Sequence, residues 1–162
     1  MYLRTPHKLS YFTDSFSSGF SPLFSLIYVS VSSHLLDDGE LEALLTQAND
    51  NNNEFGVTGM LLYYEGAFMQ ALEGTEEVVR SLFVRIGQDP RHHLITPLLE
   101  EYIAERNFPD WSMGYYRLNR EEASRLPDYV SFADVDQFLA YFQETPEKSL
   151  QLLRSFSQPA QY

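Results

Sequence analysis

A glutamine within an apolar stretch is the residue of this chain that most needs a chemical explanation. In AFMQALEG, residues 67–74, alternation with a period of two places Phe68, Gln70 and Leu72 on one face of an expected strand. A buried amide without hydrogen-bond partners costs about 1–3 kcal/mol. The residues alone leave two alternatives open. In the first, the amide has ordinary partners, either solvent or backbone groups. In the second, a bound molecule supplies the partners.

Common catalytic motifs are absent from the sequence, which contains no P-loop, G-x-S-x-G, H-E-x-x-H or G-x-G-x-x-G pattern. His92 and His93 are adjacent, so on a strand or helix they point in different directions and a shared metal is not expected. The pairs Glu76-Glu77 and Glu100-Glu101 are typical of a solvated surface. Because there is no cysteine, disulfides, thiolate metal sites and cysteine nucleophiles are excluded, and redox chemistry would need a cofactor.

The pattern of apolar residues predicts five strands around this glutamine. They are expected at about residues 23–33, 57–64, 67–74, 94–104 and 111–118. In the first strand Tyr28 shares a face with Leu26 and Ser30, and Glu65-Gly66 suits a tight hairpin turn between the second and third. Pro97 indicates that part of the fourth strand lies at a sheet edge or a bulge.

Two amphipathic helices are expected between these strands. Asp37 and Glu40 resemble a capping box, and the helix that follows is expected to end at the asparagine cluster 49–53. Thr75 can cap the second helix, which Gly87, Asp89 and Pro90 would stop. The apolar stripes of the two helices are formed by Leu41, Leu44, Leu45 and Ala48, and by Val79, Leu82, Phe83 and Ile86.

The order of these elements, β-α-β-β-α-β-β, predicts an α+β fold with a ferredoxin-like sheet and two helices on one face. Further helices after residue 119 keep apolar residues at helical spacing and are expected to pack on the other face. We therefore expect one domain organised as a loose extension at 1–22, a core at 23–118 and a helical cap at 119–162.

Composition restricts the partners. The chain has 162 residues, and 11 basic against 23 acidic side chains give a net charge of −12, which disfavours direct binding to nucleic acid. No stretch approaches the roughly 18 apolar residues that suggest a membrane span, and the N-terminus lacks the apolar run of a signal peptide. A cytoplasmic protein without membrane contact is expected.

Several segments together carry a family resemblance. N-N-x-E-F-G-V-T-G-M-L-L-Y-Y-x-G-A-F-M-Q-A-L-E-G at 51–74 resembles the central signature of BLUF domains, which are sensors of blue light using flavin. R-I-x-x-D-x-R-H-H at 85–93, W-S-M at 111–113 and Tyr28 early in the first strand match the same pattern. The similarity covers about residues 23–118.

The resemblance implies that FAD, or in some members FMN, lies between the two helices. Asn52 would then use its amide as donor and acceptor for the O4 and N3-H edge of the flavin ring, with Asn51 beside it. Arg85 and Asp89 resemble positions that contact the polar ring edge or the ribityl chain, and Ile86 resembles one that packs on the ring.

The resemblance also implies a non-enzymatic light response. Excitation of the flavin would draw an electron and then a proton from Tyr28, and Gln70 would rotate, tautomerise or both. A new hydrogen bond to flavin O4 would shift the absorption to longer wavelength. Trp111 and Met113, on one face of the last expected strand, would relay the change to the C-terminal helices.

The expected output is contact with a separate signalling or regulatory protein, and family members of this size are often homo-oligomers. One alternative is a small ferredoxin-like hydrolase similar to acylphosphatase, although no Gly-rich anion-binding loop precedes either helix. Another is a degenerate protein-binding module without photochemistry, which would be colourless.

Overall fold

The structure is a computed structural model that describes residues 21–126 and 134–157. All but the last two residues of the expected N-terminal extension lie outside the described residues, as do parts of the expected cap. The strands are β1 (Leu23–Ser32), β2 (Thr58–Tyr64), β3 (Ala67–Thr75), β4 (His92–Ile103) and β5 (Gly114–Arg117). The helices are α1 (Asp38–Phe55), α2 (Glu76–Gly87), α3 (Arg120–Ala123), α4 (Val135–Glu144) and α5 (Glu147–Ser157).

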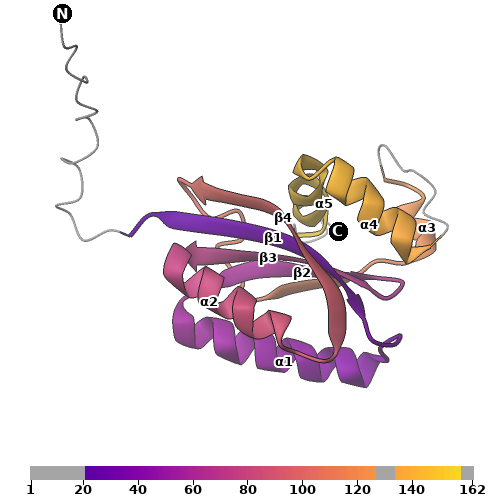
Figure 1. Cartoon of the computed structure of the whole chain (residues 1–162), viewed down its shortest axis with the longest axis horizontal. Coiled ribbons are helices and arrows are strands. Elements are labelled where there is room, and N and C mark those ends of the chain that lie inside the picture. The colour runs from indigo at the N-terminus through magenta and orange to yellow at the C-terminus, as the bar shows by residue number, and fades with distance from the viewer. Residues whose placement is uncertain (1–20, 127–133, 158–162) are drawn as a thin grey trace, which may run out of the picture.

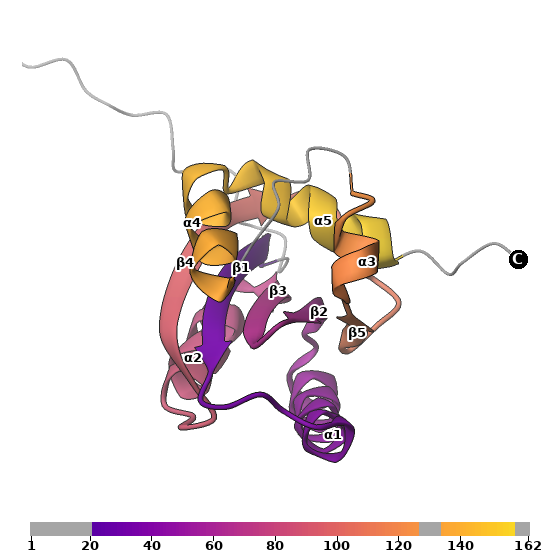
Figure 2. The same ribbon diagram turned by 90° about the vertical axis from the view of Figure 1, so that its right-hand side faces the viewer.

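The five strands form one sheet in the order β4-β1-β3-β2-β5. Neighbouring strands are antiparallel except β2 and β5, which are parallel. Helices α1 and α2 cover one face, and α4 and α5 cover the other (Figures 1 and 2). The predicted α+β ferredoxin-like arrangement is therefore confirmed, with β5 added beside β2.

Two apolar cores lie on opposite faces of the sheet. The pocket core, between the sheet and α1 and α2, includes Leu26, Tyr28, Phe68 and Leu72, as the period of two predicts. The cap core lies between the sheet and the C-terminal helices. Its helical members include Phe138, Leu139, Phe142, Leu152 and Leu153. The expected cover of the second face is thus confirmed.

The β2–β3 hairpin turns where predicted. Tyr64 pairs with Ala67, and the two residues between them have positive φ, 49° at Glu65 and 88° at Gly66. Two left-handed residues in a row suit the twist of a two-residue hairpin, and glycine adopts the second without a Cβ clash.

Helix α1 begins with the predicted capping box, because Asp37 Oδ1 accepts from the Glu40 amide at 2.9 Å and Glu40 Oε2 accepts from the Asp37 amide at 3.0 Å. The predicted end at the asparagine cluster is wrong, since the helix continues to Phe55 and ends at Gly56 with φ 66°. Within the cluster Asn49 Nδ2 donates to the Leu45 carbonyl, so that side chain bonds along the helix instead of breaking it.

Helix α2 begins after Thr75 as predicted, but the Thr75 side chain makes no capping hydrogen bond. The predicted cap is therefore wrong in its chemistry although right in its position. Acidic residues in the first turn, Glu76 and Glu77, favour the positive end of the helix dipole.

Strand β4 agrees with its prediction, whereas β5 is shorter than predicted. β4 is an edge strand with a register shift at Ile27/Tyr28 opposite Pro97, as the proline predicted. β5 contains only Gly114–Arg117, so the expected strand 111–118 is too long, and Trp111 and Met113 do not share a strand face. The Trp111 carbonyl accepts from the Gly59 amide, and a Cβ on Gly114 would lie 2.2 Å from the Trp111 ring, so the chain folds over itself before β5 begins.

Helix α3 was not predicted. Asn119 and Glu122 form a capping box around it, a signal present in the sequence that the expected strand end obscured. None of the helices in 21–126 and 134–157 is long and apolar enough to cross a membrane.

Candidate functional site

A pocket lies between α1, α2 and the sheet face that carries Gln70. Its polar lining comes from three strands, two helices and the α2–β4 loop: Tyr28, Gln70, Asn51, Asn52, Arg85 and Asp89, with Gln47, Arg91 and His92. Its apolar lining comprises Leu44, Ala48, Leu61, Phe68, Leu82 and Ile86. Tertiary packing therefore brings seven of the nine expected site residues to one pocket, and Trp111 and Met113 are not in its lining.

Tyr28 and Gln70 face each other across paired strands at the pocket wall. They are register partners of β1 and β3, and both are buried, with 3% and 5% of their surface exposed. The Tyr28 hydroxyl donates to Gln70 Oε1, and Gln70 Nε2 donates to Met113 Sδ at 3.4 Å. The two ends of the amide thus have different partners, a phenol and a thioether.

Burial, and in second place the negative charge of Asp89, raises the pKa of Tyr28 far above its ordinary value. The phenol is therefore neutral at physiological pH and keeps the proton that it donates to Gln70. This leaves Tyr28 able to act as a donor of both a proton and an electron.

The C-terminal turns of α1 are fastened to the segment before β5. Asn52 is buried, and its Nδ2 donates to the Ser112 carbonyl at 2.6 Å, while Ser112 Oγ donates to Asn49 Oδ1 at 2.6 Å. The bond from Asn52 uses one of the two N–H groups of its amide. Asn52 therefore connects the pocket to the Trp111–Met113 segment.

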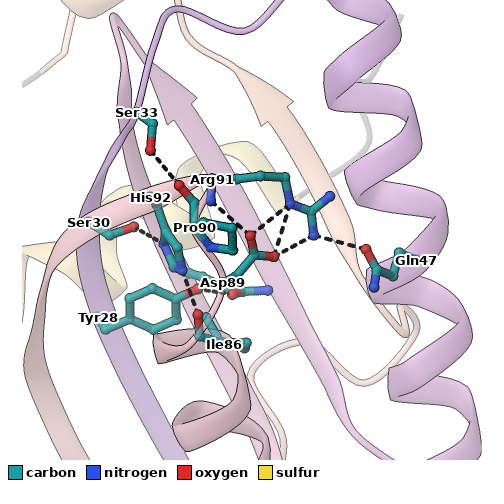
Figure 3. Close-up of polar contacts among 10 residues, drawn as sticks. Tyr28, Ser30, Ser33, Gln47, Ile86, Asp89, Pro90, Arg91 and His92 are labelled. Atoms are coloured by element: carbon teal, nitrogen blue, oxygen red, sulfur yellow. Dashed lines mark hydrogen bonds and ion pairs between the residues drawn. The ribbon is translucent and has the colours of Figure 1, made fainter.

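The loop between α2 and β4 forms a second polar corner of the pocket (Figure 3). The Arg91 guanidinium donates to the Asp89 carboxylate and, at 2.9 Å, to Gln47 Oε1 on α1. These hydrogen bonds from Arg91 hold the pKa of Asp89 below its usual value, against the opposing effect of burial. The corner ties α1 to the α2–β4 loop through a charged pair.

His92 fixes the same loop from the sheet side. Its Nε2 lies 2.7 Å from the Ile86 carbonyl, which can only accept, so Nε2 carries the hydrogen. Nδ1 lies 2.8 Å from Ser30 Oγ and accepts from it when the ring is neutral. His92 thus joins the end of α2 to β1 through its two ring nitrogens.

The chemistry of the lining suits a flat heteroaromatic molecule. Apolar side chains from α1, α2 and the sheet provide the walls, and amides supply both donors and acceptors near the Tyr28 phenol. A flavin ring has apolar faces and an edge with alternating donors and acceptors, so these residues fit it. The fold and the pocket together define a ferredoxin-like domain whose pocket, lined by a buried tyrosine and a buried glutamine, suits a flat cofactor.

Comparison with known proteins identifies the family. The family model described as BLUF, sensors of blue-light using FAD, matches residues 23–114. This match covers more than half of the chain, including strands β1 to β4 and the first residue of β5. The chain belongs to the BLUF family, and the hydrolase alternative is not favoured.

Two curated relatives and one solved structure illustrate the match. The blue light- and temperature-regulated antirepressor BluF of Escherichia coli (strain K12) is 37% identical over 138 residues, covering 83% of this chain. The photoactivated adenylate cyclase subunit beta of Euglena longa is 34% identical over 60% of this chain. The dark-state structure of BlrB, a BLUF protein, is 30% identical and has a TM-score of 0.66, with 85% of this chain and 96% of that chain covered.

This chain spans only part of the curated relatives, 32% of the length of BluF and 11% of the cyclase subunit. The activities named for those whole proteins are therefore not carried to this chain by the match. Membership in the BLUF family shows that this chain is a sensor that binds flavin.

Some pocket residues were missed by sequence reasoning. Arg91 and His92 lie within the R-I-x-x-D-x-R-H-H segment, which contained the signal for both. Gln47 had no signal, because it is a polar residue outside the apolar stripe of α1, where a solvated side chain is expected. Ser112 and Asn49 act through side-chain contacts between segments 63 residues apart, which no local pattern shows.

The structure separates the two expected relay residues. Met113 is buried in the pocket core against Gln70, whereas the Trp111 ring packs against the cap core. The segment before β5 thus presents one side chain to each face of the sheet.

Proposed function

We propose that this chain senses blue light by holding a flavin non-covalently between α1 and α2 and passes the change to a partner protein without catalysing a reaction. The observation that carries the proposal is the buried Tyr28–Gln70 pair, whose amide is bonded at both ends and lines a pocket suited to a flat ring. The membership in the BLUF family supports the same function.

Five side chains are proposed to hold the flavin. Asn52 and Asn51 would present amide groups to the polar ring edge, and Ile86 would pack on the ring. Arg85 and Asp89 would contact the ring edge or the ribityl chain. In support, all five line the same pocket, from α1, α2 and the loop after α2.

When bound, the flavin supplies absorption of blue light and an excited state that accepts an electron. Tyr28 is proposed as the donor, because its neutral phenol lies within the pocket and its proton already points at Gln70 Oε1. As Tyr28 gives up and regains this proton and electron, Gln70 would turn or tautomerise. Because the two ends of the amide differ as donor and acceptor, the turn reverses its hydrogen bonds with little change in volume.

FAD is the proposed cofactor, because the family description names it. We further propose that the output goes to a separate regulatory protein, since the relative BluF is named an antirepressor. The chain is also proposed to act as a homo-oligomer in the cytoplasm. The −12 net charge supports a protein partner in preference to nucleic acid.

The test uses the full chain, purified in the dark and supplied with FAD. We expect a yellow protein whose flavin bands shift to longer wavelength under blue light and return in the dark. Chromatography of the flavin released by denaturing protein purified without added flavin will distinguish FAD from FMN. A colourless protein after incubation with either flavin would overturn the proposal and favour a degenerate binding module.

A further inference from the structure

A buried carboxylate lies on the face of β3 opposite Gln70. Glu73 is fully buried, and its Oε2 accepts from the Asn107 and Phe108 amides at 2.7 and 3.1 Å. Its Oε1 accepts from Asn107 Nδ2 at 2.7 Å and from Ser25 Oγ at 3.4 Å. All four partners are donors, and a carboxylate with this set compensates for the loss of water. Glu73 thus holds the turn at 107–108 in one orientation.

The loop held by Glu73 is the β4–β5 loop, residues 104–113, and it reaches both faces of the sheet. At its far end Met113 contacts Gln70 and the Ser112 carbonyl accepts from Asn52. At its near end the Arg106 guanidinium donates to the carbonyls of Glu73 and Gly56, at 2.7 and 2.9 Å. One end of the loop therefore contacts a proposed photoactive side chain, and the other is fixed to the same strand three residues further on.

Helix α5 is attached to the fixed end of this loop. Arg154 of α5 donates to Asn107 Oδ1, while the Nδ2 of the same amide donates to Glu73. Phe108, the next residue, is buried in the cap core, where α5 contributes Leu152 and Leu153. Asn107 is therefore a junction between the buried carboxylate and the C-terminal helix.

We propose that Glu73 and Asn107 couple the pocket to α5, with Glu73 as a positioning residue for signal output. The inference rests on the proposed function, in which Gln70 turns and changes its bond to Met113. Because Glu73 holds the opposite end of the loop, a displacement at Met113 cannot be absorbed by free rotation of residues 107–108. It is passed to Asn107 and, through Arg154, to α5.

The experiment compares the light and dark states of the full chain with bound flavin. Two variants remove the coupling at different points: Arg154→Gln at the exposed α5 contact, and Glu73→Gln at the buried anchor. Arg125→Gln is the matched control, because Arg125 is an exposed arginine whose partner is Glu121. Arg154→Lys keeps a long, positively charged donor for Asn107, which the shorter and neutral glutamine does not provide, and is the conservative rescue.

Two quantities are measured: the red shift of the flavin bands, and the light-minus-dark difference in hydrogen exchange of the α5 amides. We expect all variants to keep the red shift. The α5 difference should fall about 2- to 30-fold in Arg154→Gln and Glu73→Gln, the range expected for loss of a coupling contact. It should remain near the wild-type value in Arg125→Gln and recover in Arg154→Lys.

The possible outcomes distinguish failure of the coupling to α5 from failure of the proposed light-sensing function. A full α5 response in folded Arg154→Gln would overturn the coupling through Asn107, even if Glu73→Gln failed to fold. A wild-type protein with a red shift but no light response in α5 would overturn the coupling and leave the light-sensing function standing. A wild-type protein without a red shift would overturn both.

Discussion

The amide of Gln70 is held by a phenol at its oxygen and a thioether at its nitrogen. The first bond joins β3 to β1, and the second joins β3 to the segment before β5. A thioether is a weak acceptor, so the nitrogen end is held less firmly than the oxygen end. In the proposed switch, this inequality would allow the amide to turn when the proton on Tyr28 moves.

Substitution of either residue of this pair should separate cofactor binding from the light response. We expect Gln70→Leu and Tyr28→Phe to retain flavin, because the other lining residues remain, and to lose the red shift, because the amide or the phenolic proton is missing. Absorption spectra before and after blue light measure both properties. A normal shift in either variant would refute the proposed switch.

The raised pKa of Tyr28 predicts a dependence of stability on pH. Above pH 10, the ordinary value, an unfolded chain loses this proton while the folded chain keeps it, so the free energy of unfolding falls as the pH rises. Tyr28→Phe lacks this effect and should gain up to about 1.4 kcal/mol per pH unit on the wild type above that pH.

Denaturant unfolding of the wild type and of Tyr28→Phe, at pH values from about 9 to about 12, measures how the difference between their free energies of unfolding changes with pH. Their difference at pH 7, where the phenol is protonated in both states, is the reference. A constant difference across the series would contradict the burial of Tyr28 as the cause.

At the scale of elements, helix α1 places Asn51 and Asn52 at the pocket, and its N-terminus depends on Asp37. We expect Asp37→Ala to lower the free energy of unfolding by about 0.5–2 kcal/mol, because the Glu40 amide loses its acceptor. Thermal or urea unfolding measures the loss. Asp37→Asn keeps an acceptor oxygen and should lie near the wild type, so an equal loss in both would rule out capping as the reason.

The β4–β5 loop shows how one element can serve two layers. Trp111 packs on the cap core and Met113 on the pocket core, so the loop is fixed by apolar contacts on both faces of the sheet. A continuous strand through 111–118 would place these two side chains on one face. The irregular backbone is what makes contact with both cores possible.

At the scale of the whole molecule, the excess of acidic residues sets which partners can approach. With a net charge of −12 we expect no binding to duplex DNA at about 10 μM protein and physiological salt, in light or in darkness. Fluorescence anisotropy of a labelled duplex provides the measurement. Binding that weakens steeply with added salt would show a basic surface that overrides the net charge.

Much of the fold followed from local sequence. The period of two placed Gln70 on the face of Phe68 and Leu72 within its own strand, the capping box began α1, and Glu65-Gly66 made the hairpin. These features depend on residues a few positions apart, whose backbone preferences and burial patterns act within one element. The resemblance to the BLUF family, which covers about residues 23–118, then indicated a flavin as a partner of the amide.

Tertiary structure decided the contacts between distant segments. Local preference predicted that the asparagines would end α1, whereas the helix continues and Asn52 bonds Ser112, 60 residues away. The separation of Trp111 from Met113 and the burial of Glu73 beneath Asn107 also depend on which layers meet across the sheet. Such contacts form only when distant elements pack together, so their energies have no signal in the neighbouring residues. The sequence by itself therefore determined the strand face and residue types of the proposed switch, and the packing of the sheet decided what that switch touches.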